Sequence, residues 1–320
     1  MLIANNEKIS LDKKEAGATI DFISHAHTDH MSALSTARSI LSSYQTIELI
    51  KARTSSSNLF NINLDFSELG IKLLDSGHIL GASQLFYYNE QKSQSILYSG
   101  DFQMQSPFIG KRIETKNADI LIIDSTYPDP EIKFEENSET KKKIQDWVLE
   151  KIETGNIFFG SYSLGKAQDI IKILNEIGII PIVNRQTCAI NRVYINFGED
   201  LKYASVYEAD SGYDEIMSKN FVGIVELGRL NSLKIELTKA YKKRAYTAVA
   251  SGLTKIMKFN SDATFELSNH ADFEQSIEYI EKVAPKKIFT YGTNKDRFAR
   301  NLAKLGYNAS PFESNELNKV

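Results

Sequence analysis

The segment Ser24-His25-Ala26-His27-Thr28-Asp29-His30 decides the fold class of this chain. Three of the five histidines in the sequence fall within it, directly after a short apolar run. Side chains two residues apart on an extended chain point the same way, so His25 and His27 should project together at a strand end. A turn then brings Asp29 and His30 to the same pocket. This density of nitrogen and oxygen donors suits zinc or a similar metal better than it suits a polar loop rich in histidine by chance.

Length and composition are those of a folded α/β protein. The chain has 320 residues, of which 42% are hydrophobic and 25% charged, so one large unit or a unit with an inserted lobe is expected rather than disorder. The net charge of -3 argues against a surface coated with basic groups. Positive charge is instead clustered locally.

Cysteine content limits the metal ligands and the compartment. Cys188 is the only cysteine, which excludes an intrachain disulfide and a thiolate zinc cage and fits a reducing cytoplasm. The opening residues lack a secretory signal pattern, and no apolar stretch is long enough to span a bilayer. We therefore expect a cytoplasmic protein without a membrane partner, whose metal is held by histidine and carboxylate.

Two further polar clusters follow short apolar runs. His78 lies between Gly77 and Gly81, which would let the backbone approach a crowded centre, and Asp101 lies in Ser99-Gly100-Asp101-Phe102. Alone, each is explained as a hydrogen-bonded turn histidine or a turn-forming aspartate. Together with the histidine segment they indicate one metal centre.

Short apolar or alternating runs predict the order of strands and helices. In the first third they predict strands at 19–24, 72–74, 84–88, 95–98 and 120–123. A boundary is expected near 127–130, where two prolines precede a charged helix at 139–151. The middle alternates strands at 156–159, 179–183 and 223–225 with a helix at 166–177, which predicts a mostly parallel sheet. Beyond it come a strand at 245–250, a helix at 273–283, a strand at 287–291 and a helix at 295–305.

The ordered motifs resemble those of a known family. His-x-His-x-Asp-His after a strand, then Gly-His-x-x-Gly-Ala and Ser-Gly-Asp-Phe, resemble the metallo-β-lactamase superfamily. Asp124-Ser125-Thr126-Tyr127 and Ser268-Asn269-His270-Ala271-Asp272, separated by a lobe of over a hundred residues, are similar to the nucleic-acid-cleaving β-CASP branch. The segment 162–168 and the short length resemble its compact exonuclease-like members, including the ligase-associated type, and the nucleases like the mRNA 3'-end-processing factor.

The resemblance implies a fold and its division. The fold is α/β, a four-layer αββα metallo-β-lactamase core split by an inserted α/β β-CASP lobe. The core would comprise residues 1–128 and 251–320, and the lobe residues 129–250.

The resemblance also implies roles for individual residues. His25, His27 and His78 would bind one Zn²⁺, Asp29 and His30 a second, and Asp101 would bridge the two, with Mn²⁺ as an alternative metal. Asp124 would orient His270 near the scissile phosphate. The expected catalytic residues are Asp29, Asp124 and His270.

One position departs from the family pattern. RNA-cutting members usually carry a histidine on the strand after His270 as a ligand of the second metal, whereas the Artemis-like DNA group tends to have valine. This chain has Tyr291, which could be a weak oxygen ligand, contact the substrate or pack. The second metal therefore has one ligand fewer than in RNA-cutting members.

Substrate-binding residues are expected in two places. The stretch from Lys234 to Lys258, including Lys243 and Arg244, is basic and could guide a nucleic acid, although a solvated helix face is the simpler explanation. The segment 160–167 matches a nucleotide-binding P-loop except that alanine replaces the magnesium-binding Ser or Thr. There, Ser163 and Lys166 could hold a backbone phosphate at a helix N-terminus, with a surface lysine as the default.

These features together predict a zinc-dependent nuclease acting on RNA or DNA, in RNA processing or DNA-end processing, as an exonuclease or an endonuclease. A small-molecule esterase or thioesterase on the same core is one alternative. A non-catalytic nucleic-acid-binding β-CASP subunit is the other. A homo-oligomer is compatible with the sequence.

Overall fold

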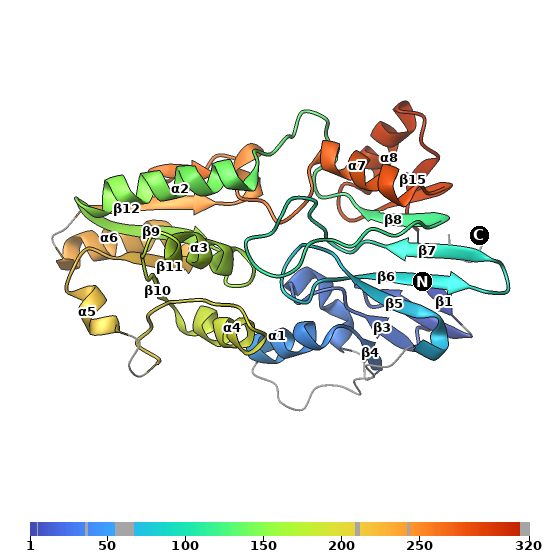
Figure 1. Cartoon of the computed structure of the whole chain (residues 1–320), viewed down its shortest axis with the longest axis horizontal. Coiled ribbons are helices and arrows are strands. Elements are labelled where there is room, and N and C mark those ends of the chain that lie inside the picture. Colours follow the sequence, from blue (N-terminus) through green and yellow to red (C-terminus); the bar gives the residue numbers. More distant parts are fainter. Residues whose placement is uncertain (5, 36–37, 55–66, 209–211, 242–243, 314–320) are drawn as a thin grey trace. The chain divides into compact units, whose positions relative to one another are not determined.

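The computed structural model describes residues 1–4, 6–35, 38–54, 67–208, 212–241 and 244–313. The chain divides into two compact units (Figure 1): the first unit is Met1–Lys133 with His270–Val320, and the second unit is Phe134–Asn269. The sequence predicts the return to the first unit near residue 250, whereas the compact units divide between Asn269 and His270. Residues 251–269 belong to the second unit because β13 (Ala263–Phe265) pairs with β12 (Arg244–Ala250) in its sheet.

The first unit contains two β-sheets. The four-stranded sheet has the order β1 (Leu2–Ala4), β2 (Glu7–Leu11), β3 (Ile20–Phe22) and β4 (Ser39–Leu41). The six-stranded sheet has the order β15 (Ala309–Pro311), β14 (Lys287–Tyr291), β8 (Ile120–Asp124), β7 (Gln94–Tyr98), β6 (Ser83–Asn89) and β5 (Ile71–Asp75). In the larger sheet β7, β8, β14 and β15 are parallel, whereas β5, β6 and β7 are antiparallel. Both sheets of this unit are therefore mixed.

Strand β8 shows how the first unit is layered. Ile120 and Ile122 lie in the core cluster shared with the four-stranded sheet, which includes Phe22. Leu121 and Ile123 lie in a second cluster, with the helices α7 (Phe273–Val283) and α8 (Lys295–Lys304). The strand is apolar throughout because both of its faces are covered. With α1 (Tyr44–Thr54) following β4, the order of layers confirms the predicted αββα fold.

The second unit is built on a parallel five-stranded sheet. Its order is β10 (Ile182–Val183), β11 (Val222–Glu226), β9 (Gly155–Ser161), β12 and β13, and every pairing is parallel. The connecting helices are α2 (Asn137–Ile152), α3 (Lys166–Asn175), α4 (Arg185–Asn196), α5 (Tyr213–Met217) and α6 (Leu230–Tyr241). This confirms the inserted α/β lobe and its parallel sheet. None of the helices in the described part of the chain is long and apolar enough to cross a membrane.

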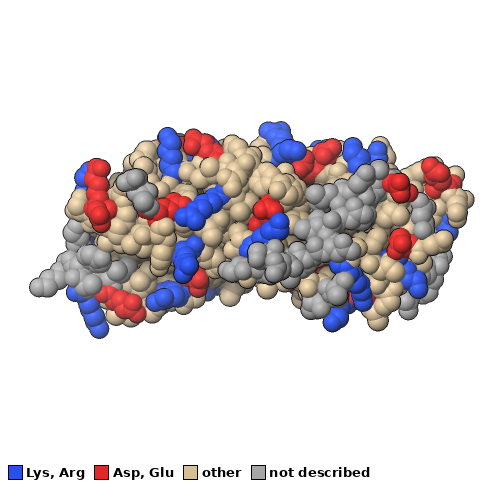
Figure 2. All heavy atoms as spheres, turned by 90° about the horizontal axis from the view of Figure 1, so that it is seen from below, with Lys and Arg blue, Asp and Glu red and all other residues tan. Residues whose placement is uncertain are grey.

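The predicted basic stretch is partly neutralised. Lys234 pairs with Asp262 at 2.7 Å and Lys255 pairs with Glu266 at 2.7 Å. Arg244 is exposed and lies over the ring of Tyr246, 4.7 Å from its centroid. Lys243 lies outside the described residues. Among the described residues on the face drawn in Figure 2, basic and acidic side chains are interspersed.

Candidate metal centre

Sheet topology brings the predicted site residues to one edge of the six-stranded sheet. Parallel strands β7, β8 and β14 end at the same edge, and there they lead into Asp101, Asp124 and Tyr291. Strands β5 and β6 are antiparallel, so the turn between them, which carries His78, lies at that edge too. The strand before the histidine segment ends at Phe22, shorter than predicted, and His25 and His27 follow beyond it.

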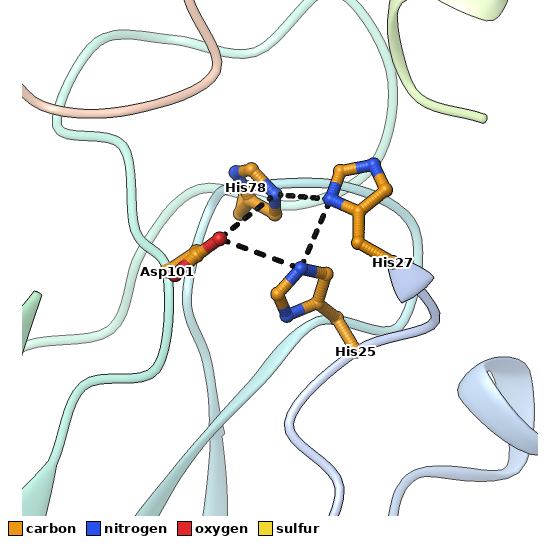
Figure 3. Close-up of side chains that lie close together, drawn as sticks. All are labelled: His25, His27, His78 and Asp101. Atoms are coloured by element: carbon orange, nitrogen blue, oxygen red, sulfur yellow. Dashed lines mark hydrogen bonds and ion pairs between the residues drawn. The ribbon is translucent and has the colours of Figure 1, made fainter. Parts of the chain in front are cut away.

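Four side chains form the first cluster. One donor atom from each of His25, His27, His78 and Asp101 lies within 4.8 Å of all the others, and Figure 3 shows the four pointing toward one another. His27 Nδ1 is 3.0 Å from His25 Nε2 and 3.1 Å from His78 Nε2. Donors at the corners of a zinc tetrahedron with bonds of about 2.0–2.1 Å are separated by about 3.3 Å. The cluster therefore fits a metal ion.

The turn that carries His78 requires glycine on both sides. Gly77 has φ +77°, and a Cβ on it would lie 2.5 Å from the carbonyl oxygen of Gln103. Gly81 has φ +75°, and a Cβ there would lie 2.5 Å from Cβ of Gln45. Larger residues at these positions would push the turn away from the cluster. The close backbone approach agrees with the expectation from the sequence.

A second set of donors surrounds His30, on the short 3₁₀ helix η1 (Thr28–His30). His30 Nε2 is 3.3 Å from Asp101 Oδ2 and 3.7 Å from Asp29 Oδ2. The Asp29 side chain is 81% exposed, so it can move toward an ion without unpacking the core. Asp101 is thus shared between both sets.

Electrostatics favour a charged Asp101. Burial alone raises its pKa, but the surrounding histidines, His30 first, bring the pKa well below the usual range of a carboxyl group. Burial lowers the pKa of His25 well below its usual value, and His30 adds to that effect. A buried carboxylate facing a neutral imidazole is the donor pair that a divalent cation requires.

Asp12 is the site residue that sequence analysis missed. It is 1% exposed, and its carboxylate accepts hydrogen bonds from the Ser24 amide (2.7 Å), the Ser24 hydroxyl (2.7 Å), Tyr98 (2.6 Å) and His30 Nδ1 (2.8 Å). Burial lowers the pKa of His30, but Asp101 and Asp12 outweigh it and hold that pKa well above its usual value. By occupying Nδ1, Asp12 leaves Nε2 of His30 to face the centre. The only signal in the sequence is an aspartate after an apolar strand.

His270 faces the same centre and is held by Asp124. Its Nδ1 is 3.2 Å from Asp124 Oδ2, and its Nε2 is 3.9 Å from Asp101 Oδ2. Burial and then the negative charge of Asp101 raise the pKa of Asp124, which also accepts hydrogen bonds from the amide and hydroxyl of Thr126. The structure thus brings Asp124 and His270 to the metal-ligand cluster, as expected from the sequence.

Tyr291 turns away from the donors. Its hydroxyl donates to the carbonyl oxygen of Leu11 at 3.1 Å, and its ring meets that of Tyr98 edge-on at 5.4 Å. Lys13 lies over the other part of the ring, 4.7 Å from its centroid. Of the three roles left open by the sequence, these contacts match packing.

Lys166 is not a surface lysine. It begins α3, is 7% exposed, and its Nζ donates to Oδ1 of Asn269. Ser163, in the turn before α3, is half-buried and accepts a hydrogen bond at its carbonyl from Gln168. The expectation that Lys166 is exposed is wrong, because its ammonium group is occupied within the second unit.

Arg53 on α1 donates hydrogen bonds to the segment directly before Asp29 and His30. Its guanidinium donates to the carbonyl oxygen of Ala26 and, at 2.8 Å, to the hydroxyl of Thr28. We expect Arg53→Ala to lower the affinity for a second metal ion by about tenfold, because supporting contacts of this kind typically cost about 10- to 100-fold when removed. Zinc titration measures this.

The matched control for this prediction is Lys51→Ala on the same helix. Among the described residues, Lys51 pairs with the partly exposed Glu48, a surface pair of little consequence. Equal zinc affinities in the two variants would contradict a role for Arg53.

Known proteins resemble this chain in sequence and in structure. No family model matches the sequence. The chain is 28% identical over 306 residues to a probable DNA ligase from Opitutus terrae, covering 92% of this chain and 29% of the ligase. It is 28% identical over 172 residues to cleavage and polyadenylation specificity factor subunit 3 from Dictyostelium discoideum, covering 48% of this chain and 22% of that protein. The crystal structure of a protein of unknown function from Enterococcus faecalis V583 has the same fold, with a TM-score of 0.60 and 15% identity over 89% of this chain and 78% of that one.

Two facing sheets, with a histidine and aspartate cluster at one edge that could hold a metal ion, are the features of the metallo-β-lactamase fold. With the inserted α/β unit and these relatives, the chain belongs to the metallo-β-lactamase/β-CASP family. It spans less than a third of the length of the two curated relatives described above.

Proposed function

We propose that this chain is a zinc-dependent nuclease that hydrolyses phosphodiester bonds. The observation that supports this best is the convergence of His270, backed by Asp124, on the same Asp101 oxygen that faces His25 and His30. A positioned proton donor beside two sets of metal ligands is what cleavage of a phosphodiester requires.

Each residue has a defined part in the proposed reaction. His25, His27, His78 and Asp101 would hold one ion, and Asp29, His30 and Asp101 a second. Bound zinc would acidify water and neutralise phosphate charge. Asp124 would accept a hydrogen bond from Nδ1–H of His270, so that Nε2 faces the centre, and in the imidazolium form Nε2–H would protonate the leaving oxygen.

DNA is the first substrate to test. The match to the probable DNA ligase covers 92% of this chain, whereas the match to the cleavage and polyadenylation factor subunit covers 48%. Ser163, Lys243 and Arg244 remain the proposed contacts to the substrate backbone. Binding through such contacts should weaken steeply as salt rises.

The test is an assay with end-labelled DNA and RNA of matched sequence, with added Zn²⁺ or Mn²⁺. We expect cleavage that a chelator abolishes, and a rate at least about 100-fold lower for His27→Ala, because the first ion loses a ligand. The control is Asp146→Asn, an exposed change on α2. If neither polymer is cut and His27→Ala behaves like the parent, the proposed function is wrong.

Metal content separates the nuclease from a non-catalytic binding subunit. Two ions per chain support the nuclease, one ion is compatible with it, and none favours the binding subunit. A small-molecule esterase would instead bind metal and hydrolyse activated esters while leaving both polymers intact.

A further inference from the structure

A buried polar network in the second unit ends at the residue directly before His270. Nζ of Lys166 donates to Oδ1 of Asn269, and Nδ2 of Asn269 donates to Oδ2 of Asp169 at 2.6 Å. Lys166 and Asp169 are 7% and 5% exposed. Asn269 therefore bridges an ammonium and a carboxylate that lie one helical turn apart on α3.

Burial makes this pair costly to keep. Burial lowers the pKa of Lys166 to about 8, against the effect of the nearby Asp169. Burial also raises the pKa of Asp169 to about 6, against the effects of Lys166 and Asn269. Two buried charged groups add little net stability compared with apolar side chains of the same size, but they impose a strict geometry on the polar group that bridges them. Here the partner is the amide group of Asn269.

The start of α3 is a rigid support for this network. Oε1 of Gln168 accepts from the amide of Gly165 at 2.7 Å, and its Nε2 donates to the carbonyl of Ser163 at 3.0 Å and to Asn191 at 2.7 Å. Every polar atom of the Gln168 side chain is thus satisfied, which fixes the turn that presents Lys166 and Asp169.

The residues that follow Asn269 are held as closely within the first unit. The carbonyl oxygen of His270 accepts from Nε2 of Gln103 at 3.0 Å, and the amide of Ala271 donates to the carbonyl of Phe102 at 2.8 Å. Phe102 and Gln103 directly follow Asp101. The backbone on the far side of His270 is therefore fixed to the segment that follows Asp101, and the near side is held through the side chain of Asn269.

We propose that Lys166 and Asp169 are positioning residues for His270, acting through the side chain of Asn269. They hold the peptide that enters His270, so that its Nε2 is directed at Asp101. This rests on the proposed function, since it assigns His270 a part in catalysis. It also gives the P-loop-like segment 160–167 a role that needs no bound nucleotide, because Lys166 donates a hydrogen bond within the protein.

The test exchanges the amide group of Asn269 and the carboxylate of Asp169 between these two neighbouring positions. Asn269→Asp places two carboxylates on one lysine, and Asn269→Ala disconnects the network from the chain. Both should lower kcat by about 10- to 100-fold with KM within about threefold, since misplacing a reacting group by 1 Å costs about that much. The double variant Asn269→Asp/Asp169→Asn restores one lysine, one carboxylate and one amide, and should recover most of the lost kcat. A parent-like kcat for both Asn269 variants, or a double variant as slow as Asn269→Asp, would overturn the proposal.

A second measurement keeps this proposal apart from the nuclease assignment. Hydrogen exchange of the amides of His270 and Ala271 should be about tenfold faster in Asn269→Asp and should return to the parent rate in the double variant. If the parent cuts neither DNA nor RNA, the proposed function fails and exchange alone decides the positioning. Exchange rates that are the same in all variants overturn it.

Discussion

Asp101→Asn is expected to slow phosphodiester cleavage by at least about 1000-fold, because several kcal/mol of transition-state stabilisation depend on both ions. Oδ2 of Asp101 lies 3.3 Å from His30, 3.4 Å from His25, 3.8 Å from His78 and 3.9 Å from His270. Four histidines thus surround one carboxylate oxygen. An amide would remove the negative charge that both donor sets share.

The measurement is metal content per chain after dialysis, followed by the cleavage rate at saturating Zn²⁺. Both should fall together, whereas Asp146→Asn, an exposed carboxylate on α2, should match the parent in both. A variant at position 101 that keeps two ions and the parent rate would show that the bridging role is wrong.

Asp12→Asn is expected to lower the free energy of unfolding by about 3–5 kcal/mol, the usual effect of breaking a buried charged pair. Oδ2 of Asp12 accepts from Ser24, His30 and Tyr98 at once. An amide NH₂ facing the same hydrogens would leave buried donors unsatisfied. Because His30 would also lose its orientation, the affinity for a second ion should fall by about 10- to 100-fold.

Urea unfolding in the presence of a chelator isolates the effect on stability, and zinc titration measures the effect on the metal. Tyr98→Phe is the graded comparison: it removes one of the donors to Asp12 and should cost only about 1 kcal/mol. If Asp12→Asn unfolds at the same urea concentration as the parent and binds zinc equally well, Asp12 does not support His30.

Elements with a strong local pattern were predicted well. The helix Phe273–Val283 and the strand Lys287–Tyr291 have the bounds expected from their apolar periods. Strand β13 was missed because Ala263–Phe265 has no clear alternation and exists through its pairing with β12. That pairing is also why the second compact unit extends beyond the boundary predicted near residue 250. Short strands at a sheet edge depend on their neighbours more than on their own residues.

In the candidate site, too, some residues are close in the sequence and others are brought together by tertiary structure. His25, His27, Asp29 and His30 are close in the chain, so their meeting could be expected from spacing alone. The approach of His78, Asp101, Asp124 and His270 was expected from motif order and resemblance. The topology of the six-stranded sheet helps to explain it, because the carboxyl ends of parallel strands lie at one edge of the sheet.

By itself, the sequence determined that any metal ligands would be histidine and carboxylate, because it has a single cysteine, and that three histidines fall within six residues after an apolar run. Only the tertiary structure decided that Asp12 accepts a hydrogen bond from His30, that Tyr291 packs against Tyr98, and that Lys166 donates to Asn269. Asp12 and Tyr98 are 86 residues apart, and Lys166 and Asn269 are 103 apart. Contacts at such separations depend on how sheets and helices pack, and no spacing of residues along the chain encodes them locally.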